Sequence, residues 1–410
     1  LQGRASTTIE MLATAKHYLG AGGMKWGSSA NKDFVIDQGT TVFDEETLRT
    51  FYVPPFKAAI DAGVLSVMVG LNSVGKQKIS ANKYLISDVL KEELGFSGFV
   101  VSDWYGVYEI PGGEYAAVVT AINAGVDMVM LPYDYKTFIK NVTTAVQKGD
   151  IPKARIDDAV QRILRAKFAV GLFEKNPLED VSVVGSSEHR TLAREAVSKS
   201  LVLLQNKNQV LPLSINIKKI LIAGSAAHNT GKQSGAWTVE WQGIDGNAII
   251  GATSILEGIK KKLNPNTEVL YNQRGYFEVS ENIADIGIAI VGETSYAEGW
   301  GDEENPALSR EDTDAISLLK KSSKKVVVII ISGRPLILPE EINDWDALVA
   351  AWLPGSEGEG VADVLFGKKP FSGKLPLPWP SSLSQLPFSP DGVSANKTEP
   401  LFQKGFGLGK

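Results

Sequence analysis

A short apolar segment followed by a loop, an amphipathic helix and a glycine recurs along residues 10–170. The apolar segments show no clean alternation of polar and apolar residues, which is typical of strands covered on both faces of a parallel sheet. Consecutive units of this kind connect in the same right-handed sense, so the pattern predicts neighbouring β/α units in one sheet. The predicted strands cover residues 13–19, 66–70, 98–102 and 127–131.

The predicted helices end in a repeated signal, a small residue or Leu followed by Gly. Glycine suits the left-handed conformation that commonly ends a helix, and Asp44 is suited to cap the start of the helix that ends before Gly63. A (β/α)8 barrel needs roughly 250 residues, so four units make either a small open sheet or half of a barrel. The terminal pairs are Ala62-Gly63, Leu94-Gly95 and Ala124-Gly125, and further helices are predicted at 135–148 and 153–170.

The second half of the chain predicts another covered parallel sheet, an α/β sandwich. Helices are expected at 254–262 and 312–322, and the tail from residue 368 on is rich in Pro and Gly. The predicted strands cover residues 218–224, 268–272, 285–292, 325–332 and 347–352. The fold class is therefore α/β, with a first domain at 1–175, a linker at 176–200 that leads into a helix at about 188–204, and a second domain at 201–410.

Composition excludes several classes of function. The 410 residues carry 42 basic and 47 acidic side chains without a block of like sign, which argues against nucleic acid and membrane surfaces as partners. The absence of cysteine excludes disulfides and thiolate nucleophiles, and the three histidines have no metal-ligand spacing. We therefore expect no metal and no cysteine chemistry.

Polar and aromatic residues stand where the predicted strands end, the edge at which parallel α/β sheets carry their function. The first strand ends in Lys16-His17 and the third in Asp103-Trp104, and an acidic, aromatic loop at 292–304 follows a strand of the second domain. Another loop carries Trp237 and Trp241. Indole rings stack on sugar faces and carboxylates bind hydroxyls, so this set favours a carbohydrate ligand.

Each of these residues also has a purely structural interpretation. Asp103 could cap a helix, His17 could be a satisfied core histidine, the acidic loop could be solvated, and the two tryptophans could pack a hydrophobic corner. The residues alone therefore predict a two-domain α/β hydrolytic enzyme, with sugars as one candidate substrate class.

The order of the motifs resembles glycoside hydrolase family 3, in the branch of β-glucosidases and exo-β-glucanases. The resemblance covers essentially the whole chain. It rests on Ala15-Lys16-His17-Tyr18, Gly98 to Trp104, Arg155 to Leu164, Arg194 to Leu204, Trp237 to Gly243, Gly292 to Asp302 and Ala351 to Gly358. It implies a (β/α)8 (TIM) barrel, here its C-terminal half, followed by an α/β sandwich.

The resemblance also implies a mechanism and a site. Asp103 corresponds to the nucleophile and Glu298 to the general acid/base of a retaining β-glucosidase that releases terminal β-D-glucosyl residues from a β-glucoside or β-glucan. The substrate-binding positions correspond to Lys16, His17, Met68, Trp104 and Trp241. No metal and no organic cofactor is implied.

The chain departs from the family pattern at its start, because the motifs begin inside the barrel domain. A second chain that supplies the N-terminal half of the barrel is therefore expected as a partner, since half a barrel exposes strand edges. Ala21, Leu71 and Glu109 replace residues that many relatives place near the substrate, which leaves the preferred linkage open.

Two alternatives remain open within these observations. One is a β-N-acetylglucosaminidase of the same family, which is disfavoured because that branch often has no sandwich domain. The other is a non-catalytic sugar-binding subunit, which has no need of both Asp103 and Glu298. A periplasmic or extracellular location is favoured, but the sequence does not fix it.

Overall fold

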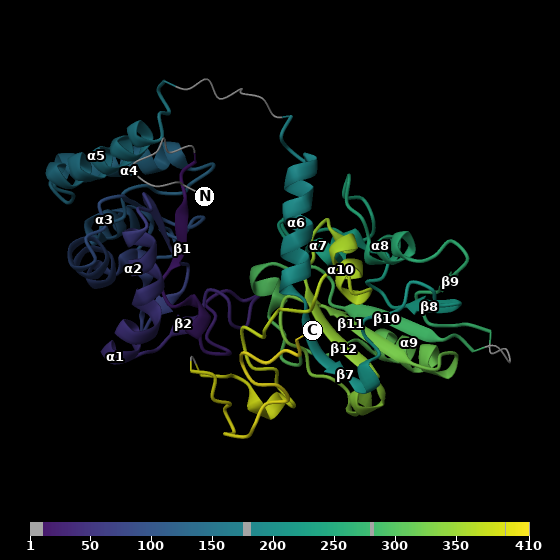
Figure 1. Ribbon diagram of the computed structural model, residues 1–410. Coiled ribbons are helices and arrows are strands. Elements are labelled where there is room, and N and C mark those ends of the chain that lie inside the picture. The colour runs from purple at the N-terminus through teal and green to yellow at the C-terminus, as the bar shows by residue number, and fades with distance from the viewer. Residues whose placement is uncertain (1–10, 175–181, 279–282, 390, 410) are drawn as a thin grey trace. The chain divides into compact units, whose positions relative to one another are not determined.

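The computed structural model describes residues 11–174, 182–278, 283–389 and 391–409. The chain divides into two compact units (Figure 1). The first comprises Leu1–Glu179 together with the short segment Glu298–Asp302. The second comprises Asp180–Ala297 and Glu303–Lys410.

The first unit contains a parallel sheet in the order β1-β3-β6, formed by Thr14–Tyr18, Ser66–Val69 and Phe99–Val101. A fourth strand was expected at 127–131, but this stretch makes only an isolated bridge between Met128 and Val101. The reason is that few backbone bonds join the two segments: the amides of 127 and 128 both donate to Val100 O, and Ser102 N donates to Met128 O.

Helices connect these strands, and their predicted ends are confirmed. Asp44 caps its helix by accepting a hydrogen bond from Thr47 N at 2.8 Å, and Gly63, Gly95 and Gly125 all have positive φ. The helices are α1 (Glu45–Thr47), the π-helix η2 (Leu48–Tyr52), α2 (Val53–Asp61), the π-helix η4 (Tyr84–Glu93), α3 (Glu114–Ala124), α4 (Tyr135–Lys148) and α5 (Lys153–Ala169). A small sheet of β2 (Thr40–Thr41), β4 (Ser73–Val74) and β5 (Gln77–Lys78) completes the unit.

The two faces of the first sheet differ in their packing. Tyr18, Val67 and Val100 belong to the large core formed with the helices. The neighbouring side chains Phe99 and Val101 point the other way and form a smaller cluster with Ala166 of α5. Alternation along each strand therefore separates a helix-covered face from a second face that holds fewer buried residues.

A buried charge cluster fixes α5 and η4 beside the sheet. The Asp127 side chain is fully buried, accepts hydrogen bonds from Lys91 Nζ at 2.8 Å and Val100 N at 2.8 Å, and pairs with Arg155. Burial lowers the pKa of Lys91 to about 8, although Asp127 opposes that shift. Because removal of one partner from such a cluster leaves unpaired buried charge, this cluster constrains the packing of both helices.

The second unit is a six-stranded sheet in the order β7-β12-β11-β10-β8-β9, parallel except for β7. Ile222, Ile288 and Ile329 face α8 and α10, whereas Ala223 and Val328 face α9, so helices cover both faces (Figure 1). The strands are β7 (Val202–Asn206), β8 (Lys219–Ala223), β9 (Glu268–Tyr271), β10 (Ile286–Gly292), β11 (Val326–Ile331) and β12 (Ala347–Trp352). The helices are α6 (Ser187–Ser200), α7 (Thr230–Ser234), α8 (Ile255–Lys262), α9 (Arg310–Lys321) and α10 (Gly358–Leu365). The predicted α/β class is confirmed.

One strand of this sheet was missed in the sequence. The helix expected at about 188–204 ends at Ser200, and Val202–Asn206 forms the antiparallel strand β7. A short apolar run does not distinguish a buried strand from a buried helical turn, which explains the error. Much of the stretch proposed as a linker at 176–200 is α6, which packs on α10, while 175–181 lies outside the described residues. Among the described residues, no helix is long and apolar enough to cross a membrane.

Candidate active site

The first candidate residues lie at the end of β1. Lys16 is exposed, and the His17 side chain is 35% exposed, so His17 is not a core histidine. The register between β1 and β3 shifts between Ala15 and Tyr18, the stretch that carries both residues. Such irregularities redirect side chains beside functional sites.

Asp103 and Trp104 follow β6, and Asp103 meets His17. The distance between His17 Nε2 and Asp103 Oδ2 is 3.3 Å, and Trp104 N donates a hydrogen bond to Asp103 Oδ1 at 2.6 Å. The next α-helix, α3, begins only at Glu114 and has Gly113 as its N-cap. The alternative that Asp103 merely caps the following helix is therefore wrong.

The neighbouring backbone is anchored by Ser102. Its hydroxyl accepts a hydrogen bond from Met130 N at 2.9 Å and lies 3.0 Å from Asp103 O. Because Ser102 is buried, these bonds fix the strand end from which the Asp103 side chain projects.

The surroundings of His17 favour its neutral form. Burial lowers the pKa of His17, and this outweighs the opposing charges of Asp103 and Asp37; Lys16 lowers it further. The contact with Asp103 is then one between an imidazole whose neutral form is favoured and a carboxylate. A neutral imidazole can donate through one nitrogen and accept through the other, which suits a sugar hydroxyl.

Two further candidates, Trp104 and Met68, belong to the first unit. Trp104 is 53% exposed, with an edge contact to Tyr105, so much of its indole surface is available to a ligand. Met68, in β3, is partly buried and packs with the smaller cluster around Phe99 and Val101. Both residues offer the apolar surface that a sugar face contacts.

Glu298 begins the 3-10 helix η6 (Glu298–Gly301), and its segment is grouped with the first unit. Glu298 is exposed, and its φ of 53° lies in the left-handed region that a non-glycine residue seldom adopts. Asp103, His17 and Glu298 therefore belong to the same compact unit, although about 200 residues separate the two carboxylates in the sequence.

Trp241 belongs to the second unit. It is 43% exposed, and its carbonyl accepts a hydrogen bond from Trp237 N at 3.0 Å, closing a tight turn in which the two indole centroids are 6.5 Å apart. Trp237 is still more exposed, so the two rings do not form a buried hydrophobic corner.

Sequence reasoning missed several residues that contact the backbone around Glu298. Gln242, next to Trp241, exchanges two hydrogen bonds with the backbone of Ala297, the residue before Glu298. Asp37 accepts a hydrogen bond from Gly299 N, and Asp302, at the end of the segment Glu298–Asp302, accepts one from Val35 N. Asp302 and Gln242 stand in motifs already noted, although neither was identified as a contact residue, and no pattern in the sequence identifies Asp37.

Glu109, one of the departures from the family pattern, pairs with Lys78. Lys78 Nζ lies 2.5 Å from Glu109 Oε2 and also donates to Leu71 O at 2.8 Å. This ion pair ties together the loops that follow β3 and β6. The carboxylate of Glu109 is therefore already paired with the ammonium group of Lys78.

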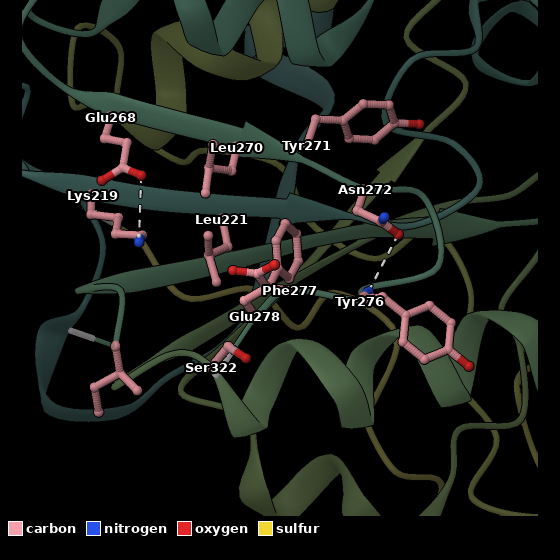
Figure 2. Close-up of a pocket in the computed structure, with 11 residues that line it drawn as sticks. Lys219, Leu221, Glu268, Leu270, Tyr271, Asn272, Tyr276, Phe277, Glu278 and Ser322 are labelled. Carbon is pink, nitrogen blue, oxygen red and sulfur yellow. Dashed lines mark hydrogen bonds and ion pairs between the residues drawn. The ribbon is translucent and has the colours of Figure 1, made fainter. Parts of the chain in front are cut away.

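A separate cavity of about 420 Å³ lies in the second unit, between β8, β9 and the segment before β10 (Figure 2). Its lining includes Tyr271, Tyr276 and the ion pair of Lys219 with Glu268. None of the seven candidate site residues lines it. The cavity is therefore distinct from the residues considered above.

Comparison with known proteins assigns both units to one family. Residues 1–166 match the glycosyl hydrolase family 3 N-terminal domain, and residues 201–410 match the C-terminal domain of the same family. The chain is 32% identical to a lysosomal beta glucosidase of Dictyostelium discoideum, over 97% of this chain and 51% of that protein.

Two solved structures are similar throughout the chain. An exo-1,3/1,4-beta-glucanase from a Pseudoalteromonas species is 39% identical, with a TM-score of 0.87, over 97% of this chain and 50% of the other. A beta-glucosidase from Listeria innocua, solved with glucose, is 26% identical, with a TM-score of 0.85, over 100% of this chain and 59% of the other. The chain spans about half the length of these relatives. On both domain matches and these similarities, the chain belongs to glycosyl hydrolase family 3.

Proposed function

We propose that the protein is a retaining β-glucosidase or exo-β-glucanase that removes terminal β-D-glucosyl residues. The observation that carries this proposal is the contact of Asp103, which follows β6, with His17, near the end of β1, beside the exposed Trp104. Family membership and the names of the relatives support a β-glucoside as the substrate class.

The proposed reaction has two steps with Asp103 as the nucleophile. An Asp103 carboxylate oxygen bonds to the anomeric carbon as the bond to the aglycone oxygen breaks, and Glu298 donates its proton to that oxygen. Glu298 then takes a proton from water, the water oxygen bonds to the anomeric carbon, and the Asp103 carboxylate is released. Two displacements return the sugar to its original β configuration.

The surrounding residues bind and orient the glucosyl unit in this proposal. Trp104 N–H holds Oδ1 of Asp103, which limits rotation of the carboxylate. Lys16 and the neutral His17 bind hydroxyls, and Met68, Trp104 and Trp241 contact the faces of the sugar. The chemistry requires no metal and no organic cofactor.

A paired-substrate assay tests the reaction class. We expect nitrophenyl β-glucoside to be hydrolysed with a kcat/KM about tenfold or more above that of nitrophenyl N-acetyl-β-glucosaminide, because the added acetamido group must be accommodated at the site. Proton NMR should show β-glucose as the first product. Preference for the N-acetylated substrate would contradict the proposal, and so would glucose binding measured by calorimetry without any turnover.

We also propose that further β/α units cover the apolar surface that the first unit exposes. Val160, Leu164 and Phe168 of α5 are exposed apolar side chains, and within the described residues β1 pairs on one side only, with β3. A (β/α)8 barrel covers such surfaces with further β/α units. We expect activity to require those units, and full β-glucosidase activity of these 410 residues alone in monodisperse form would contradict this.

A further inference from the structure

We propose that Asp302 and Asp37 are positioning residues for Glu298, two carboxylates that fasten the segment Glu298–Asp302 to the loop at 33–37. This inference rests on the proposed role of Glu298 as the general acid/base. We refer to the paired contacts as the carboxylate latch.

The first half of the latch is the carboxylate of Asp302. Its Oδ2 accepts hydrogen bonds from three successive backbone amides, those of Val35 at 2.9 Å, Ile36 at 2.7 Å and Asp37 at 3.0 Å. Hydrogen bonds to a charged acceptor are stronger than neutral ones, and three of them at one oxygen define both position and direction. The loop at 33–37 is thus shaped around this carboxylate.

In the second half of the latch the acceptor belongs to the loop at 33–37 and the donor to the segment Glu298–Asp302. Asp37 Oδ2 accepts a hydrogen bond from Gly299 N at 3.0 Å, and its Oδ1 accepts one from Gln38 N at 2.8 Å. The amide of Gly299 belongs to the peptide that follows Glu298. The Asp37 carboxylate therefore holds the backbone one peptide bond away from the Cα of Glu298.

Phe34 of the loop also packs against the segment beside these hydrogen bonds. Phe34 lies against Gly299, where an added Cβ atom would overlap the phenyl ring, and it makes an edge contact with Trp300 at 5.7 Å between centroids. Only glycine fits at 299 in this arrangement. A side chain there would push the segment away from the loop.

The latch also accounts for the backbone of Glu298. Its left-handed φ of 53° is a conformation that a non-glycine residue adopts at a cost in free energy and keeps where the surroundings enforce it. Two sets of bonds enforce it: the one that Asp37 makes with Gly299 within η6, and those that Asp302, directly after η6, makes with the loop at 33–37.

The test uses the dependence of rate on the leaving group, which separates acid catalysis from general damage to the fold. An acid is needed to expel a poor leaving group such as phenol or methanol, but not dinitrophenol. Misplacing a catalytic group by about 1 Å can lower the rate about 10²-fold. In the whole protein, we expect Asp302→Ala to lower kcat/KM about 10²-fold for phenyl and methyl β-glucosides and less than about threefold for dinitrophenyl β-glucoside.

Two further latch variants and one control complete the series. Gly299→Ala, which places a methyl group against Phe34, should show the same leaving-group dependence, and Asp302→Asn should give an intermediate effect. Glu304→Ala removes an exposed carboxylate two residues beyond Asp302 and should match the wild type on every substrate. Hydrolysis of dinitrophenyl β-glucoside by each variant shows that the variant is folded.

The outcomes distinguish this inference from the function on which it rests. Equal losses on all substrates for Asp302→Ala and Gly299→Ala, or rates like those of Glu304→Ala, would overturn the latch as a positioning device. If Glu298→Ala itself shows no leaving-group dependence, the proposed acid/base role fails. If the rate of Glu298→Ala depends on the leaving group but the rates of Asp302→Ala and Gly299→Ala do not, the acid/base role stands and only the latch fails.

Discussion

Replacing Asp103 by alanine is expected to lower kcat on aryl β-glucosides by about 10⁴- to 10⁶-fold, the loss typical of removing a covalent nucleophile. The variant keeps its strand end, because Ser102 and not the carboxylate anchors that backbone. Added azide should restore part of the turnover of dinitrophenyl β-glucoside. It would attack the anomeric carbon from the face that Asp103 has vacated, so the product should be the inverted α-glucosyl azide.

A matched control for this experiment is Asp157→Asn on α5. Asp157 is exposed and pairs with Lys153 one helical turn away, so its loss should leave activity unchanged and stability within about 1 kcal/mol. Recovery of activity by azide without any glucosyl azide, or wild-type rates in Asp103→Ala, would exclude Asp103 as the nucleophile.

The second large effect is expected from Glu298→Ala. Loss of the general acid should lower kcat/KM for phenyl β-glucoside by about 10²- to 10⁴-fold, with a much smaller loss for dinitrophenyl β-glucoside. Here the nucleophile is intact, and azide needs no base to attack the glycosyl-enzyme. The azide product should therefore be the retained β-glucosyl azide, the opposite anomer from that formed by Asp103→Ala.

This pair of anomers assigns the two roles independently of rates. Glu304→Ala serves as the control, because it removes a carboxylate from the same loop. The same azide anomer from both catalytic variants would contradict the assignment. So would a Glu298→Ala variant whose rates fall equally for every leaving group.

The sequence predicted the regular elements well where local chemistry determines them. Asp44 and the glycines at 63, 95 and 125 act through their own side chain or backbone conformation, so their roles as caps could be identified without a structure. The central strands β10 and β11 are long apolar runs with a single interpretation. In contrast, β7 begins only two residues after the last residue of α6, and the sequence predicts helix there. Only the pairing of β7 with β12 makes it a strand.

For the candidate site too, the sequence identified some residues and could not identify others. Position at a strand end indicated His17 and Asp103, and the structure brings them within 3.3 Å. The latch could not be predicted, because its hydrogen bonds join residues 262 to 267 positions apart. Asp37 has no sequence signature of its own, since its partner is a backbone amide, and any residue other than proline supplies such a donor.

The most direct test of the proposed chemistry is to trap the covalent intermediate. Dinitrophenyl 2-deoxy-2-fluoro-β-glucoside should glycosylate a single carboxylate, because its good leaving group permits the first step while fluorine slows the second. Intact-mass and peptide-mapping analysis should show one deoxyfluoroglucosyl group attached to Asp103. A label on any other residue, or steady turnover of nitrophenyl β-glucoside by protein that never acquires the label, would contradict Asp103 as the nucleophile.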